Sequence, residues 1–273
     1  MLDWLGRRLG DIAWIALPRR RGLAITNVAV AFPALEPTGR RRLARRSFQE
    51  LGVTALEVCA LLRSPDRALR GIAIDGRDHL ARVLASHGRA LILTAHLGNW
   101  ELLSLAQQLV GHPVAIVVRP LDAGRLNDVI ERFRAAAGVE IIAKRHAARP
   151  VLDALRRGHL VAILLDQNAS RRESVFVPFF GRPASTSRSI ATLAVRTDTP
   201  ILPVFIVREA PGRHRVTIHE PLVASVGSSR DETIRELTAR CTEAIEAAIQ
   251  RAPEQWLWFH DRWRTRPPEE RET

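Results

Sequence analysis

Five short apolar runs, separated by stretches with helical patterning, constrain the fold of this chain more than any other feature. The runs are ALILTA, VAIVV, VEIIA, LVAILLD and PILPVFIV, which end at Ala95, Val118, Ala143, Asp166 and Val207. Between them lie segments such as RHAARPVLDALRRG, in which apolar residues recur every three or four positions. Strands and helices in alternation predict an α/β fold, with a largely parallel or mixed sheet flanked by helices. RVTIHEPL predicts a further strand, and DETIRELTARCTEAIEAAIQ predicts a long late helix.

The 273 residues contain no internal repeat and no low-complexity linker. We therefore expect a single domain over 1–273, in which an N-terminal helical region (1–70) precedes an α/β core (71–273). A helix is expected from about Thr38 to Leu62. The two cysteines have no C-x-x-C spacing, so the sequence indicates neither a disulfide framework nor a thiolate metal site.

The chain is strongly basic, with a formal net charge of +12, and Lys144 is its only lysine. Arginine side chains pair well with phosphates and carboxylates. The excess charge therefore suits an acidic partner, which could be nucleic acid, anionic lipid or an acidic protein. Charge alone does not choose among them, and any single arginine could serve only a soluble surface.

The first 21 residues, MLDWLGRRLGDIAWIALPRRR, have the apolar spacing of an amphipathic helix. Charged residues interrupt the segment, which falls short of the roughly 20 apolar residues that a membrane span needs. Trp4 and Trp14, followed by the arginines at 19–21, suit a helix lying in the lipid interface. A helix that caps the protein core would show the same pattern. We expect peripheral membrane association through these tryptophans and arginines.

The segment HLGNWE places an ionisable pair, His96 and Glu101, just after the run ALILTA. In open α/β sheets, sites lie beyond the carboxyl ends of the strands. Gly98 or Asn99 would cap the next helix, and Glu101 would fall in its first turn. There the carboxylate could hold the imidazole in one tautomer while the other ring nitrogen acts as a general base. An isolated H-x-x-x-x-E also fits a structural histidine.

Several separated strings resemble one family. HLGNWE is similar to the H-x-x-x-x-D/E motif of glycerolipid acyltransferases, in the glutamate form found in the bacterial lipid A late acyltransferases (lauroyl/myristoyl transferases). The strings RRGLAITNVAVAFP, VVRPLD, LLDQNASRRESVFVPFFGRPASTS, ILPVFIV and PEQWLWFHDRW occur in the same order as in that family. The resemblance covers nearly the whole chain and implies a glycerolipid-acyltransferase-like fold.

The resemblance implies transfer of an acyl group from a thioester to a hydroxyl of a membrane glycolipid, most simply a lipid A precursor. His96 would be the general base and Glu101 would orient it, without a metal or other cofactor. The expected donor is acyl carrier protein, with acyl coenzyme A as the alternative. The expected location is the cytoplasmic face of the inner membrane. No G-x-S-x-G, H-E-x-x-H, G-x-G-x-x-G or P-loop string points to different chemistry.

Five further residues are candidates for substrate binding. Arg119, in R-P-x-D, would bind a phosphate of the acceptor or the oxyanion of the reaction, and Asp166 would help to hold Arg119 or the acceptor. Asn99 lies between the two expected catalytic residues. Phe179 and Phe180 would shape an apolar slot for the acyl chain, although adjacent phenylalanines also occur in ordinary cores.

Other candidates are interpreted structurally. Ser185 and Thr186 are expected to cap a helix. The aromatic segment PEQWLWFHDRW is expected to pack back onto the domain, so His260 is not our candidate base.

Three alternatives remain open at this stage. One is an acyltransferase that acts on another acceptor, such as a lysophospholipid or a phosphatidylinositol mannoside. The others are non-enzymatic: a basic membrane-binding protein or a nucleic-acid-binding protein. The absence of an RNP string or zinc-finger spacing disfavours nucleic acid as the partner.

Overall fold

The computed structural model describes residues 1–61, 69–118, 134, 137–225 and 229–267. Its helices are α1 (Leu2–Ala16), α2 (Pro18–Ala31), α3 (Pro37–Leu61), α5 (Arg77–His87), α6 (Leu103–Val110), α8 (Ala148–Arg156), α9 (Ser189–Thr197) and α10 (Arg230–Arg251). Its strands are β1 (Ile72–Asp75), β2 (Ala90–Thr94), β3 (Val114–Val118), β4 (Glu140–Ala143), β5 (Leu160–Leu164), β6 (Ser174–Phe179), β7 (Arg182–Ser187), β8 (Ile201–Ala210) and β9 (Arg213–Ile218). Short 3₁₀ helices lie at Trp100–Leu102, Arg171–Glu173 and Pro253–Gln255.

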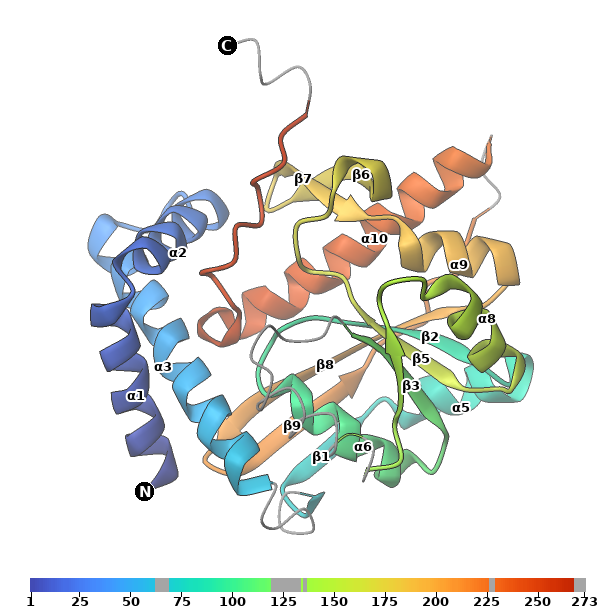
Figure 1. The fold of residues 1–273 in the computed structure, drawn as a ribbon, viewed down its shortest axis with the longest axis horizontal. Coiled ribbons are helices and arrows are strands. Elements are labelled where there is room, and N and C mark those ends of the chain that lie inside the picture. Colours follow the sequence, from blue (N-terminus) through green and yellow to red (C-terminus); the bar gives the residue numbers. More distant parts are fainter. Residues whose placement is uncertain (62–68, 119–133, 135–136, 226–228, 268–273) are drawn as a thin grey trace.

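Seven of the described strands form one sheet in the order β1-β9-β8-β2-β5-β3-β4 (Figure 1). Neighbouring strands are parallel, except that β8 and β9 run antiparallel to each other. The predicted α/β fold with a mixed, mostly parallel sheet is therefore confirmed. Each of the six expected strands and the expected late helix is present.

A separate antiparallel hairpin, β6–β7, follows the sheet strand β5, and the sequence patterns did not predict it. Ser185 and Thr186 lie within β7, so the expectation that they cap a helix is wrong. Both side chains are fully buried. The Ser185 hydroxyl donates to the Ala169 carbonyl, and the Thr186 hydroxyl accepts from the Arg262 guanidinium. Hydroxyl side chains with buried partners suit a strand as well as a cap, which is why the local pattern misled.

The two faces of the sheet bury alternate residues of each strand, as the period of a strand requires. On one face, Leu91 and Leu93 pack in a core that includes residues of α8, α9 and α10. On the other face, Ala90 and Ile92 join a second core with residues of α5 and α6. Every residue of β2 is buried, as expected for a central strand covered on both sides.

Helices α1, α2 and α3 pack together on one side of the molecule, next to the ends of β8 and β9 and to the C-terminal segment (Figure 1). The first 21 residues do not form one helix, because α1 ends at Ala16 and Pro18 begins α2. Trp4 is exposed, but Trp14 is only 5% exposed and packs against Phe48. The expectation that Trp14 lies in a lipid interface is therefore wrong. Among the described helices, none is long and apolar enough to cross a membrane.

Candidate active site

His96 and Asp166 form the centre of the candidate site, just beyond the carboxyl end of the sheet. Thr94 at the end of β2 pairs with Leu164 at the end of the parallel strand β5. His96 and Asp166 each lie two residues further along, so the register of the strands brings them to equivalent positions. Nδ1 of His96 lies 2.9 Å from Oδ1 of Asp166. The sheet register thus determines the pair.

The carboxylate of Asp166 is only 2% exposed and is surrounded by donors. Its Oδ2 accepts from the backbone N–H of His96 at 3.1 Å and from the indole N–H of Trp256 at 2.9 Å. Burial opposes ionisation, but the charge of His96 and these hydrogen bonds outweigh it and lower the pKa of Asp166. The carboxylate therefore stays ionised and accepts only.

An ionised carboxylate beside Nδ1 requires the proton of neutral His96 to sit on that nitrogen. The lone pair then lies on Nε2, for which no described residue provides a hydrogen bond. Burial disfavours the charged ring, but the charge of Asp166 and its hydrogen bond outweigh this and raise the pKa of His96. A histidine held in this tautomer, with a buried anion behind it, is the arrangement of a general base.

Glu101 does not take the position expected for it, since it makes no hydrogen bond to His96. Its carboxylate instead receives two hydrogen bonds from Arg134, at 2.6 and 3.0 Å, and one from the indole of Trp100 at 3.1 Å. The Glu101 charge still helps to raise the pKa of His96, while the Arg134 charge acts against it. Glu101 therefore lies within the electrostatic range of the imidazole, and Asp166 makes the direct contact.

An apolar pocket opens beside this site on the face of the sheet that α5 and α6 cover. Its floor consists of alternate residues of neighbouring strands, including Ile92, Ile116 and Leu164. Glu101, Arg134 and Trp100 are among the few polar or amphipathic side chains in its lining. The ring of Trp100 contacts that of His96 edge to face, with a centroid distance of 5.2 Å. Trp100 therefore links the apolar pocket to His96.

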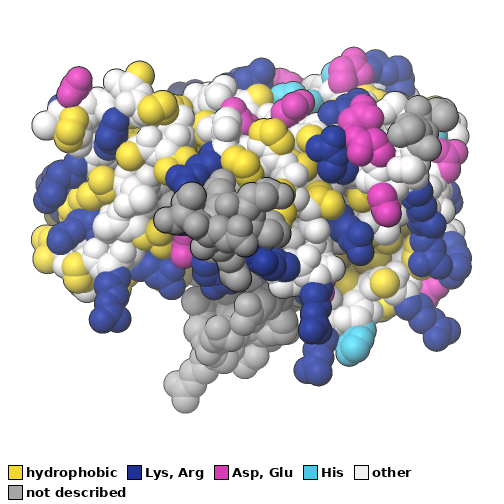
Figure 2. All heavy atoms as spheres, turned by 90° about the horizontal axis from the view of Figure 1, so that it is seen from above, with side chains coloured by type: hydrophobic (Ala, Val, Ile, Leu, Met, Phe, Trp, Pro, Cys, Tyr) yellow, Lys and Arg dark blue, Asp and Glu magenta, His cyan; other side chains and the backbone are white. Residues whose placement is uncertain are grey.

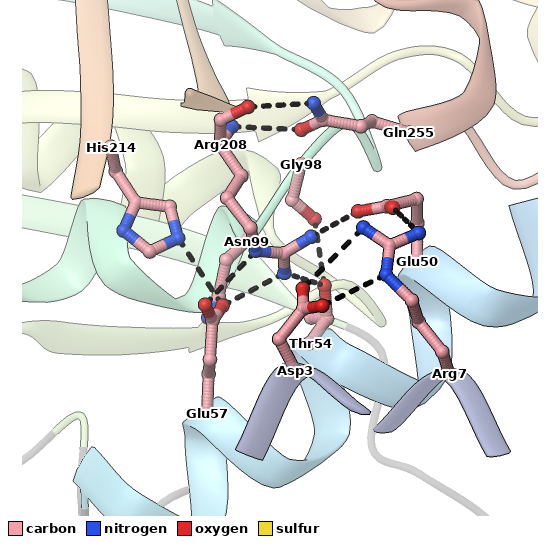
Figure 3. Close-up of polar contacts among 10 residues, drawn as sticks. All are labelled: Asp3, Arg7, Glu50, Thr54, Glu57, Gly98, Asn99, Arg208, His214 and Gln255. Atoms are coloured by element: carbon pink, nitrogen blue, oxygen red, sulfur yellow. Dashed lines mark hydrogen bonds and ion pairs between the residues drawn. The ribbon is translucent and has the colours of Figure 1, made fainter. Parts of the chain in front are cut away.

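The loop that follows His96 is fixed by a buried polar cluster (Figure 3). At its centre, the guanidinium of Arg208 on β8 pairs with Glu50 and Glu57 of α3. Glu57 also receives hydrogen bonds from His214 and from the side-chain amide of Asn99, the latter at 3.0 Å. Burial opposes the charge of Glu57, but its bonds to His214 and Arg208 outweigh it and lower the pKa of Glu57 to about 2. The cluster thus ties the loop to α3 and β8.

The C-terminal segment holds the same loop from the other side. The N–H of Gly98 donates to the carbonyl of Gln255, and Leu97 forms an isolated antiparallel bridge with Trp256. Gly98 has a φ of +60°, and a side chain there would collide with the carbonyl of Ile206. Glycine is therefore required at this position by both conformation and space.

Comparison with known proteins identifies the family of this chain. Residues 1–265 match the family described as bacterial lipid A biosynthesis acyltransferase. The chain belongs to this family. It is 29% identical over 270 residues to the lipid A biosynthesis palmitoleoyltransferase of Escherichia coli K12, covering 98% of this chain and 86% of that protein. It is 28% identical over 265 residues to the lauroyltransferase of the same organism, covering 96% and 85% of the two chains.

The structure of a 1-acyl-sn-glycerophosphate acyltransferase from Thermotoga maritima is also similar, with a TM-score of 0.41 and 15% identity, over 90% of this chain and 99% of that chain. A likeness this weak supports no further argument. The family resemblance expected from the sequence is confirmed, and the protein is an acyltransferase.

In this acyltransferase, Asn99, Phe179 and Phe180 do not have the substrate-binding environment expected for them. Asn99 is fully buried and bonds to Glu57, so it holds the loop rather than facing a substrate. Phe179 and Phe180 do not line the apolar pocket. Phe179 packs against Trp256 and Trp263, with centroid distances of 5.7 and 5.6 Å, and Phe180 packs against Trp258. Arg119 lies outside the described residues.

His260 holds the backbone after Asp166 in this acyltransferase. Its Nε2 accepts from the backbone N–H of Asn168 at 2.9 Å, and burial lowers its pKa to about 4. Sequence reasoning missed Trp256 as a partner of Asp166 and Arg134 as the partner of Glu101. No local signal marks either contact. The pairing of His96 with Asp166, by contrast, could have been predicted. Each residue lies at or just after the end of an apolar, strand-like run, and the carboxyl ends of neighbouring parallel strands lie close together.

Proposed function

We propose that this acyltransferase moves a fatty acyl chain from an acyl thioester to a hydroxyl group of a membrane glycolipid, most simply a lipid A precursor. The observation that carries the proposal is the His96–Asp166 pair, with Nε2 free, beside an apolar pocket. The names of the relatives support lipid A as the class of acceptor. Because the proposed acceptor is a membrane lipid, we expect the enzyme to associate peripherally with the cytoplasmic face of the inner membrane.

In the proposed mechanism, Nε2 of His96 takes the proton from the acceptor hydroxyl as its oxygen attacks the carbonyl carbon of the thioester. Asp166 holds the proton on Nδ1 and stabilises the imidazolium that forms. The tetrahedral intermediate then collapses, the carbon–sulfur bond breaks, and the thiolate leaves and accepts the proton from the imidazolium. The acyl group passes directly from sulfur to oxygen, so no acyl-enzyme forms, and His96 carries the proton in both directions.

The apolar pocket is proposed to hold the acyl chain of the donor. Strand residues such as Ile92 and Ile116 offer it an apolar floor, and burial of each methylene group adds about 0.8 kcal/mol. Glu101 and Arg134 lie at the polar part of the lining, where the thioester would enter. Glu101 is proposed to support catalysis by fixing Arg134 and by adding negative charge near His96. Arg119 remains a proposed ligand for an acceptor phosphate.

A panel of labelled donors and acceptors, with products identified by mass spectrometry, tests the proposed function. The full-length protein should esterify a lipid A precursor. Ester formation only on a lysophospholipid or on a phosphatidylinositol mannoside would show that the proposed acceptor is wrong and that the proposed acyl transfer to a hydroxyl group is right. No transfer to any hydroxyl would overturn the proposal.

The pH dependence of acyl transfer should identify the carboxylate that acts on His96. The base must be neutral, so the rate should rise with pH through the pKa of His96, which Asp166 raises. In Asp166→Asn the pKa should fall and this acidic limb should move to lower pH, with a lower plateau. Glu101→Gln should move the limb less, because Glu101 acts on His96 only through its charge, whereas Asp166 also makes a direct hydrogen bond to the ring. A larger shift for Glu101→Gln, measured by kcat against pH, would transfer the orienting role to Glu101.

Acyl carrier protein is the proposed donor, and ionic strength should distinguish it from coenzyme A. An arginine-rich surface attracts an acidic carrier over a broad area, and salt screens that attraction. Arg171 and Arg172 are exposed in the 3₁₀ helix beyond Asp166. Their reversal to glutamate should slow transfer from the carrier more than transfer from acyl coenzyme A. If acyl carrier protein and acyl coenzyme A gave equal transfer rates with the same dependence on salt concentration, the proposal that the carrier is the preferred donor would be wrong.

A further inference from the structure

Helix α1 presents large apolar side chains to the outside of the molecule. Of ten large apolar side chains exposed among the described residues, eight lie within the first 17 positions. They include Trp4, Ile12 and Ile15, which are 59%, 62% and 73% exposed. In Figure 2 the flank formed by the N-terminal helices shows hydrophobic side chains next to arginines. A contiguous exposed apolar surface of this kind marks a contact with a membrane or a partner.

The orientation of α1 is fixed by glycines. Gly6 and Gly10 face α3, where Gly52 lies so close that a Cβ on it would be 2.1 Å from the carbonyl oxygen of Gly6. Such backbone contact leaves no room for larger side chains at this seam. Arg7 of α1 also pairs with Glu50 of α3 at 2.9 Å. The bulky apolar side chains of α1 therefore point outward because the seam admits only small residues.

A second cavity lies between α1, α3 and the C-terminal segment; we call it the α1 groove. Its walls are mostly apolar and include Leu9, Leu17, Leu51, Ala55 and Leu257. Leu9 of α1 and Leu17, which follows the end of α1, line the groove and are also exposed, so the groove is continuous with the outer face of α1. An apolar chain could pass from the surface of α1 into the groove without crossing a polar barrier.

The α1 groove ends near the catalytic pair. Its lining includes Gln167, which directly follows Asp166, and His260, whose pKa is influenced by the charges of both Asp166 and His96. Phe48 of the groove belongs to the core that includes residues of α8, α9 and α10. The strand residues on the floor of the apolar pocket, such as Ile92, belong to the core on the α5 and α6 side of the sheet. The two cavities thus approach His96 from different faces of the sheet.

The α1 groove has a positively charged side chain, Arg20, in its lining, where it also donates to the carbonyl of Phe259. Arg8, Arg19 and Arg45 are exposed on α1, α2 and α3, and Asp11 pairs with both Arg8 and Arg45. The guanidinium of Arg8 also stacks over the exposed ring of Trp4, 5.4 Å from its centroid. Aromatic and aliphatic side chains flanked by arginines match the interface of an anionic bilayer, where apolar groups insert and cations meet headgroups.

We propose that the outer face of α1 inserts into the bilayer and that the α1 groove binds an acyl chain of the anionic lipid acceptor, with its headgroup charge at Arg20. The proposal rests on the proposed function and adds the acceptor's route: the donor chain lies in the apolar pocket, and the acceptor enters from the membrane side. A lipid acceptor needs a site that is open to the bilayer. Within the part of the chain that the structure describes, the α1 groove meets this need because it adjoins the exposed apolar face of α1.

Filling the α1 groove should weaken acceptor binding selectively. Ala55 lies in the groove lining and is exposed, so Ala55→Trp should fold and occupy the space. The KM for the lipid acceptor should rise at least about tenfold, since methylene groups lose their contacts, while the KM for the donor stays unchanged. Ala85→Trp, at an exposed position of α5, is the matched control and should leave both constants unchanged. An unchanged acceptor KM in Ala55→Trp would overturn the proposal.

Direct binding separates this proposal from the proposed function. The wild-type chain is mixed with anionic phosphatidylglycerol vesicles that carry a lipid A precursor with a diazirine in one acyl chain, and crosslinks are mapped by mass spectrometry after irradiation. Crosslinks at Leu51 or Leu257 that Ala55→Trp removes would support the site even if no transfer occurred. Crosslinks confined to the apolar pocket would overturn it. Equal labelling of Leu51 and Leu257 by a diazirine phosphatidylglycerol would also overturn it, since the groove would then hold bulk lipid.

Discussion

Replacing His96 with alanine should lower acyl transfer by about 10²- to 10⁴-fold, the usual contribution of a general base. The variant loses the imidazole that is proposed to take the proton, while Asp166 keeps its hydrogen bond from Trp256. Initial rates with saturating donor and acceptor measure the effect, and circular dichroism verifies the fold. Glu101→Ala should also reduce the rate, because Arg134 loses its anchor and His96 loses a nearby negative charge.

His87→Ala provides the matched control for this prediction. His87 is an exposed histidine at the end of α5, and its replacement should leave the rate unchanged. A His96→Ala protein with near-normal turnover would remove His96 from the mechanism.

Replacing Arg208 with methionine should lower the free energy of unfolding by about 3–5 kcal/mol, the usual cost of breaking a buried ion pair by removing one partner. Arg208 is buried, and its loss would leave Glu50 and Glu57 near each other without their shared cation. Urea unfolding followed by tryptophan fluorescence measures the change. Because Glu57 also holds Asn99, the loop after His96 should loosen as well.

Arg215→Met is the control for Arg208→Met. Arg215 also makes two ion pairs, with Asp75 and Glu209, but all three side chains are at least partly exposed. Water solvates such charges when a partner is lost, so the loss of stability should be much smaller. Equal shifts of the urea midpoint in both variants would show that burial of the Arg208 cluster does not govern its contribution.

The sequence alone determined the layers of the fold and the place of the site. Apolar runs of strand length and helical periodicities predicted β2, β3, β4, β5, β8 and β9, because burial on two faces leaves a continuous apolar string. The position of His96 directly after β2 indicated where the candidate site lies, since the carboxyl ends of parallel strands meet at one side of the sheet. The hairpin β6–β7 was missed because its residues carry no apolar alternation strong enough to distinguish it from a loop.

The partners of each side chain were decided by the tertiary structure. Spacing along the chain suggested Glu101 as the partner of His96, but the register of β2 and β5 places Asp166 beside the imidazole and leaves Glu101 to Arg134. Likewise, the spacing of α1 indicated an amphipathic helix, but it could not say which side faces the core. The close seam at Gly6, Gly10 and Gly52 turns the large side chains outward. Periodicity records which residues share a face, whereas contacts between distant segments depend on register and on the space that the packed backbone leaves.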